Sequence, residues 1–150
     1  MHSGLMANPL VRLFSPSTWK ALRHSAPALL RALKQYRRGE NEAALQSFEE
    51  CLRWMPKVPA DYAAFHGTLL VLNRRSPDAA RIYKQVLTST SEDHRPRSQY
   101  AAAYARYYLA LIERADDALA LNRWQEARDL QPAKGFASKY LPLPDPPVLS

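Results

Sequence analysis

Apolar residues recur at intervals of three and four along most of the chain, which is the spacing of one face of an α-helix. The clearest run carries Ala44, Phe48 and Cys51 on one face and charged residues on the other. Gly39 precedes this run and Pro56 follows it, so the pattern predicts a helix bounded by a turn and a proline. Further runs predict helices over residues 25–38, 61–72, 76–88, 98–114 and 116–131.

The predicted helix ends carry familiar signals. Ser25 and Ser76 each stand shortly before a proline, which predicts an N-cap followed by a proline in the first turn. Asp116 and Asp117 place negative charge where the last helix begins, a favourable position for the helix dipole. Residues 133–150 are rich in proline, so we expect an extended or polyproline-like, disordered tail.

The second helix of each predicted pair repeats one pattern. A small residue is followed four positions later by an aromatic residue and three positions after that by another small or medium-sized residue. The small residues allow neighbouring helices to approach, and the aromatic side chain fills the space one turn later. A hairpin of this size does not bury its apolar stripe alone, so the pattern predicts stacking. The three sets are Ala44, Phe48, Cys51; Ala79, Tyr83, Val86; and Ala120, Trp124, Ala127.

This pattern resembles the tetratricopeptide repeat, a helix-turn-helix unit of about 34 residues. Gly39 matches the turn glycine of the first unit, and Gly67 matches the small residue in the first helix of the second unit. The resemblance implies an all-α fold, an α-solenoid of about three stacked helix-turn-helix hairpins with an extra N-terminal helix and a Pro-rich C-terminal tail. The expected segments are residues 1–24, a basic N-terminal cap or anchor; 25–132, the repeat domain; and 133–150, the tail.

The resemblance also implies a concave groove lined by the first helix of each hairpin. Family members that clamp a terminal carboxylate use Lys, Asn and Arg in this groove, and the matching positions here are mostly small and apolar. We therefore expect the groove to hold an extended or helical apolar segment of a protein partner. The residues expected to contact it are Leu29, Leu33, Tyr36, Arg37, Ala64, Thr68, Val71, Ala105, Arg106, Leu109 and Ile112.

Charge is unevenly distributed along the chain. Residues 1–39 contain seven basic residues and no acidic one, and this segment accounts for the whole net charge of +7. Arg12, Lys20 and Arg23 interleave with apolar residues there, a pattern compatible with contact to an anionic membrane, a nucleic acid or an acidic partner. An acid-free start also resembles an organellar import segment. A cap on the end of the solenoid is the simpler alternative.

Nothing in the sequence indicates catalysis or a cofactor. The single cysteine, Cys51, lies on an apolar stripe and is expected to be a packing residue. No histidine has metal-ligand spacing, and no glycine loop for phosphate is present. Because a single cysteine cannot form an intrachain disulfide, we expect location in the cytoplasm or another reducing compartment. No apolar run reaches roughly 18 residues, so we expect no membrane-spanning segment. A position at the membrane periphery and mitochondrial or other organellar import are both compatible with this. Of Tyr100, Tyr104, Tyr107 and Tyr108, two are expected in the core and two facing a partner.

The sequence therefore favours a non-enzymatic protein–protein interaction module, such as an adaptor, a chaperone or a subunit of a larger complex. A bacterial secretion chaperone is a narrower version of this hypothesis. An RNA-binding or membrane-surface-binding helical repeat is the alternative from another class, although three hairpins are few for a code of one base per repeat. No small-molecule substrate, metal or cofactor is expected.

Overall fold

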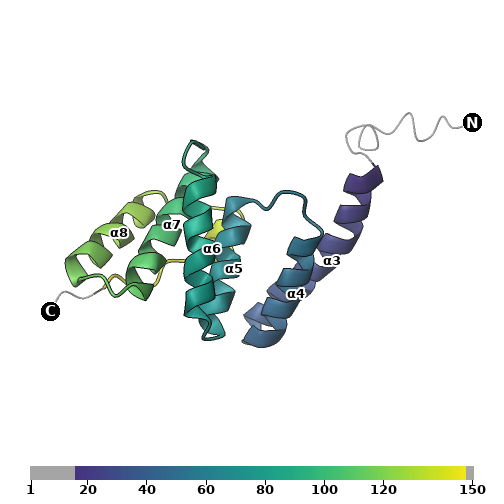
Figure 1. Ribbon diagram of the computed structural model, residues 1–150, viewed down its shortest axis with the longest axis horizontal. Helices are drawn as coiled ribbons and strands as arrows, with labels where there is room; N and C mark the ends of the chain where they lie inside the picture. Colours follow the sequence, from purple (N-terminus) through teal and green to yellow (C-terminus); the bar gives the residue numbers. More distant parts are fainter. Residues whose placement is uncertain (1–15, 148–150) are drawn as a thin grey trace, which may run out of the picture. The chain divides into compact units, whose positions relative to one another are not determined.

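The structure is a computed structural model that describes residues 16–147. This part of the chain is all-α and contains no strand (Figure 1). The chain divides into two compact units, Met1–Lys57 and Val58–Ser150, with the boundary just after Pro56. Consecutive helices pack as hairpins within each unit, which confirms the all-α class and the helical hairpins predicted from the sequence.

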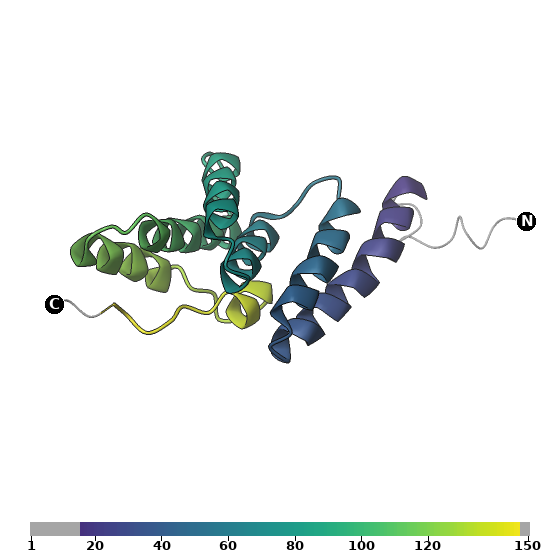
Figure 2. The ribbon, with the colours of Figure 1, turned by 60° about the horizontal axis from the view of Figure 1, so that its bottom comes forward.

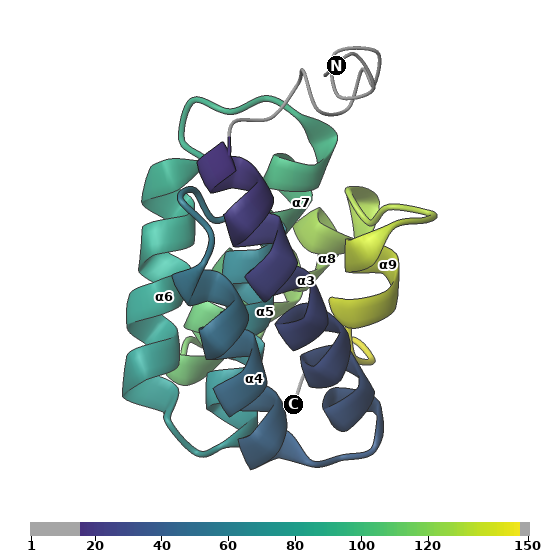
Figure 3. The ribbon, with the colours of Figure 1, turned by 90° about the vertical axis from the view of Figure 1, so that its right-hand side faces the viewer.

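The described part of unit 1 is a single hairpin of two helices. It consists of α3 (Pro16–Arg37) and α4 (Asn41–Arg53), joined by a short turn and packed side by side (Figure 3). The contact face of α4 contains Ala44, Phe48 and Cys51, all fully buried. The apolar stripe predicted for this segment is therefore the core of unit 1.

Unit 2 contains two hairpins and a short final helix. The helix α6 packs against both α5 and α7, and α7 packs against α5 and α8. The helix α9 lies beside α5, as Figure 2 shows in yellow. Its elements are α5 (Ala60–Leu72), α6 (Ser76–Ser89), α7 (Pro96–Ile112), α8 (Asp117–Asp129) and α9 (Phe136–Tyr140).

The three hairpin turns share one backbone geometry. Each contains a residue with left-handed φ: Gly39 at 75°, Arg74 at 61° and Arg114 at 57°. In each turn the N–H of the next residue donates to a carbonyl five residues earlier, over 2.9 Å. This pattern is the Schellman motif, which satisfies carbonyl groups at the end of a helix. The three turns therefore share one backbone geometry, even where the sequence has arginine instead of glycine.

The small-aromatic-small pattern corresponds to buried positions in every hairpin. Among its first and third members, the exposed fraction of the side chain is at most 4%. Phe48 and Tyr83 are fully buried, whereas Trp124 is half-buried. The indole N–H of Trp124 donates to the Pro144 carbonyl over 2.8 Å, so the C-terminal segment covers the aromatic residue of the last hairpin.

Two predicted helix starts are wrong. The helix α3 begins at Pro16 and continues through Pro27, so residues 16–24 belong to the first hairpin and Ser25 is a buried helical residue, not a cap. An internal proline removes one backbone hydrogen bond, and here the helical pattern on both sides of it prevails. Ser76 is likewise already helical, after Arg75 as the N-cap.

The prediction for Asp116 is confirmed, because its carboxylate accepts from the Leu119 N–H over 2.8 Å.

The predicted tail is also more ordered than expected. Residues 136–140 form α9, and Phe136 and Tyr140 pack their rings against Phe65 with centroids 5.6 and 5.8 Å away. Leu141 is fully buried, and its carbonyl accepts from the Tyr100 hydroxyl over 2.5 Å. Residues 141–147 are not helical, as predicted. The aromatic residues of the segment, rather than its prolines, decide that it packs onto α5.

A close contact between α5 and α6 depends on a glycine. A Cβ atom built on Gly67 would lie 2.6 Å from the Tyr83 ring, which is closer than carbon atoms approach. Tyr83 is fully buried, so its ring has no free space into which to move. The sequence match that identified Gly67 as a small position therefore corresponds to a steric requirement.

We expect Gly67→Ala to lower the free energy of unfolding by about 1–2 kcal/mol, although alanine is normally the better helix former. The added methyl group must displace the Tyr83 ring. Urea unfolding followed by circular dichroism measures the change. In a Tyr83→Leu background the same substitution should be neutral or stabilising. An equal loss of stability in both backgrounds would show that the contact with the Tyr83 ring is not the reason why position 67 requires glycine.

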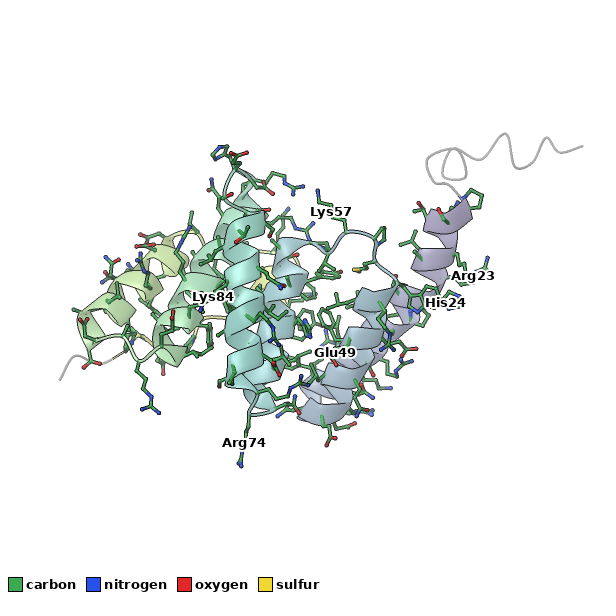
Figure 4. The ribbon with its side chains drawn as sticks, in the orientation of Figure 1. Arg23, His24, Glu49, Lys57, Arg74 and Lys84 are labelled. Atoms are coloured by element: carbon green, nitrogen blue, oxygen red, sulfur yellow. The ribbon has the colours of Figure 1, made fainter. Side chains whose placement is uncertain are left out.

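The turn geometry predicts opposite effects at equivalent positions. Arg74→Gly and Arg114→Gly should each raise the free energy of unfolding by about 0.5–1 kcal/mol, because glycine adopts left-handed φ without steric cost. Gly39→Ala should lower it by about 1 kcal/mol for the same reason. Figure 4 shows Arg74 projecting from its turn, so its side chain is not needed for packing. Thermal unfolding of the three variants checks the signs, and a loss of stability in Arg74→Gly would contradict the prediction.

Candidate interaction surface

The helix α3 contacts α4 through a stripe of small side chains. Ser25, Ala28 and Ala32 have exposed fractions of 4%, 2% and 0%, and they recur at steps of three and four residues. Small side chains allow the two helix axes to approach closely. As a consequence, the large apolar residues of α3 lie on its other faces.

A second stripe of α3 is apolar and mostly exposed. Trp19, Leu22, Ala26, Leu30 and Leu33 recur at steps of three and four residues and so share one face. Leu30 is 69% exposed, the highest value among the large apolar residues that the structure describes. Trp19 and Leu22 are 37% and 42% exposed. Together these five residues form the outer apolar stripe.

A third stripe is basic and runs directly beside the outer apolar stripe. Lys20, Arg23, Arg31 and Lys34 each follow a member of that stripe by one position. Arg31 is paired with Glu50 of α4, and its Nε donates to Ser47 over 3.0 Å. Figure 4 shows Arg23 projecting away from α4. The helix contains no acidic residue, so the only charges that α3 presents next to its exposed apolar side chains are positive.

Several residues predicted for binding lie on α3. Lys20, Arg23 and Arg37 are exposed, and Leu29, Leu33 and Tyr36 are half-buried. Arg12 lies outside the described residues. Trp19, Leu22 and Leu30 are not among the predicted binding residues, because the resemblance to the repeat placed the contact on the face of Leu29, Leu33 and Tyr36. The signal that identifies the true buried face is the spacing of small residues at positions 21, 25, 28 and 32.

The predicted binding residues of unit 2 are largely internal. Ala64 and Ala105 are fully buried, and Leu109 is 6% exposed, so these three side chains do not lie on a surface that a partner reaches. Val71 and Ile112 are half-buried. Exposed Arg106 lines a polar hollow with His94 and Gln99. The prediction failed for the buried residues because α5 and α7, treated as groove-lining helices, pack against each other.

Thr68 joins three helices instead of facing a groove. Its hydroxyl oxygen lies 3.1 Å from the Tyr83 hydroxyl on α6, 2.6 Å from the Tyr104 hydroxyl on α7 and 3.2 Å from the Ala64 carbonyl. A threonine hydroxyl has one proton and two lone pairs. If it donates to the Ala64 carbonyl, both tyrosines donate to it, and its hydrogen-bonding capacity is used completely inside unit 2.

An ion pair between exposed Arg97 and buried Asp61 links the N-terminal ends of α5 and α7. The Asp61 side chain is 4% exposed, and Arg97 donates to both of its oxygens over 3.1 and 2.7 Å. Two parallel hydrogen bonds fix the relative orientation of the two groups. Among the described residues, no buried side-chain nitrogen or oxygen lacks a hydrogen-bond partner. The buried carboxylate of Asp61 is therefore engaged in holding α5 and α7 together.

The tyrosine cluster on α7 is mainly core. Tyr100, Tyr104 and Tyr107 are at most 3% exposed and Tyr108 is half-buried, so the predicted even division between core and surface is wrong. Burial also raises the pKa of Tyr83, Tyr100 and Tyr104 above the ordinary tyrosine value.

Cys51 is fully buried, which confirms its predicted packing role, and burial raises the pKa of its thiol.

Residues 16–147 contain no group of three or more His, Cys, Asp and Glu side chains arranged to hold a metal ion. Within the same residues, no helix combines the length and the apolar character needed to cross a membrane. Comparisons with protein-family models, with characterised proteins and with solved structures find no significant match to the chain.

The raised pKa values predict a loss of stability in alkali. A tyrosine whose pKa is raised by folding contributes stability that is complete below the pKa of the unfolded chain, about 10, and is lost as the pH rises further. Urea unfolding at pH 8 and pH 11 should show the loss, and Tyr104→Phe should reduce it. Absorbance at 295 nm should show some phenols ionising only on unfolding. Titration of all tyrosines near pH 10 in an intact fold would contradict this expectation.

Proposed function

We propose that the protein is a non-enzymatic interaction protein, an adaptor or assembly subunit, whose contact face is the outer side of α3. The observation that carries the proposal is the position of Leu30, which is 69% exposed within the outer apolar stripe. Large contiguous apolar surfaces beside polar residues are typical of interaction sites. The basic stripe next to it adds charge that selects among partners.

The architecture supports this proposal in a second way. Helical hairpins with a repeated Schellman turn and a repeated small-aromatic-small core are compatible with a tetratricopeptide-like α-solenoid. Stacked hairpins of this kind present surfaces built from whole helices. We therefore infer a scaffold role for unit 2, in which the buried network around Thr68 and the Asp61–Arg97 pair hold the hairpins rigid.

The absence of catalysis is part of the proposal. Among the described residues, the buried polar side chains of unit 2 already have hydrogen-bond partners within the protein, and the exposed face of α3 offers leucine, tryptophan, lysine and arginine. These residue types supply contact area and charge for recognition rather than a nucleophile held by a general base. A buried thiol with a raised pKa, as in Cys51, is likewise a poor nucleophile.

The test replaces Leu30 by Glu and compares it with Leu119→Glu, a matched change at a 41% exposed leucine of unit 2. Some proteins or lipids of the native source should bind the wild-type chain. We expect Leu30→Glu to lower the affinity for these molecules by at least about tenfold, or 1.4 kcal/mol. Affinity purification from the native source with quantitative mass spectrometry and lipid analysis measures this.

Both variants should retain wild-type circular dichroism and thermal unfolding, because both leucines are on the surface. Equal retention of bound material by wild type and Leu30→Glu would rule out α3 as the contact face. A loss in Leu119→Glu alone would move the contact to unit 2.

A further inference from the structure

We propose that the outer face of α3 binds the surface of an anionic phospholipid membrane, with α3 lying in the plane of the interface. This inference rests on the proposed role of α3 as the contact face and names what that face contacts. The observation behind it is the adjacency of two stripes on one helix. Exposed leucine and tryptophan side chains run beside a row of cations, without an acidic residue in α3.

The shape of the face favours a membrane over a protein. The outer apolar stripe is carried by a single helix whose opposite side contacts α4, so Leu30 stands on a convex surface. A protein partner would have to present apolar side chains that match this single ridge in shape and spacing. The boundary between lipid headgroups and acyl chains deforms around it and accepts apolar side chains to a depth of about 5–10 Å.

The charges favour anionic lipid. Within residues 16–147, the side chains of Lys20, Arg23 and Lys34 make no hydrogen bond or ion pair, and all three are exposed beside the outer apolar stripe. Each cation near an anionic leaflet contributes on the order of 1 kcal/mol of attraction. Lysine and arginine also extend their charged ends toward headgroups while their alkyl chains stay with the apolar residues. A row of positive side chains suits a lipid surface of negative charge.

The composition of the stripe fits the same environment. Trp19 lies at one end, and tryptophan is enriched where a membrane meets water because its ring is apolar and its N–H is polar. From Trp19 to Lys34 the helix extends for roughly 22 Å at 1.5 Å per residue. That length lets several leucines insert along the interface, while the helix is not required to cross the bilayer.

The experiment is sedimentation of the full-length protein with phosphatidylcholine vesicles that contain or lack phosphatidylserine. We expect binding only to the anionic vesicles, with a steep loss as NaCl is raised. Leu30→Glu should lower the partition coefficient by roughly tenfold or more, since it removes an inserted side chain and adds a repelled charge. The double variant Lys20→Glu/Arg23→Glu should have an effect of similar size.

Two controls carry the same chemistry outside α3. They are Leu119→Glu and Lys84→Glu/Lys134→Glu, which replace exposed residues of unit 2 and should leave vesicle binding unchanged. Circular dichroism confirms that each variant is folded. A wild-type protein that stays in the supernatant with anionic vesicles overturns the lipid inference, and so does equal loss in the controls and the α3 variants.

The outcomes separate this inference from the proposed function. If vesicles are not bound but Leu30→Glu removes one specific protein from the purified material, α3 remains the contact face and lipid is the wrong partner. If Leu30→Glu changes neither vesicle binding nor purified material, both proposals fail. If the protein binds phosphatidylserine vesicles and only the α3 variants weaken that binding, both proposals are supported.

Discussion

Contact between helices through small side chains is the constraint on which both units depend. In unit 1 the α3 face against α4 is built from Ser25, Ala28 and Ala32, and in unit 2 Gly67 lies directly against the Tyr83 ring. Small residues bring the backbones together, and one aromatic residue per hairpin then fills the space beside them. This arrangement explains why the second helix of each hairpin repeats the same three positions.

The same constraint determines what is left outside. A helix whose contact face is occupied by serine and alanine cannot bury its leucines against its partner, so Leu22 and Leu30 remain on the surface of α3. In unit 2 the situation is reversed, because Tyr100 and Tyr104 are enclosed between helices and anchored by hydrogen bonds. The exposed apolar surface of unit 1 and the rigid polar network of unit 2 therefore have a common origin in helix spacing.

Much of the scaffold follows from the sequence because it depends on local patterns. Each helix that the periodicity predicts between residues 25 and 131 is present in the structure, and the spacing of Ala44, Phe48 and Cys51 identified buried positions. The turns at Arg74 and Arg114 lack glycine, so their shared geometry becomes visible only in the backbone. The end of the chain was misjudged because prolines dominate its composition, while its packing depends on two aromatic rings.

The candidate surface was harder to predict because periodicity alone does not say which face of a helix is inside. On α3 the leucines and the small residues both recur at helical spacing, and hydrophobicity favours burying the leucines. Packing decides otherwise, since Ala28 and Ala32 are at most 2% exposed and a leucine at either position would separate the helices. A rotation of α3 by one residue would bring the basic or the apolar stripe into the contact. The tight fit of two alanines thus fixes both the stability of the hairpin and the face that α3 presents to its surroundings.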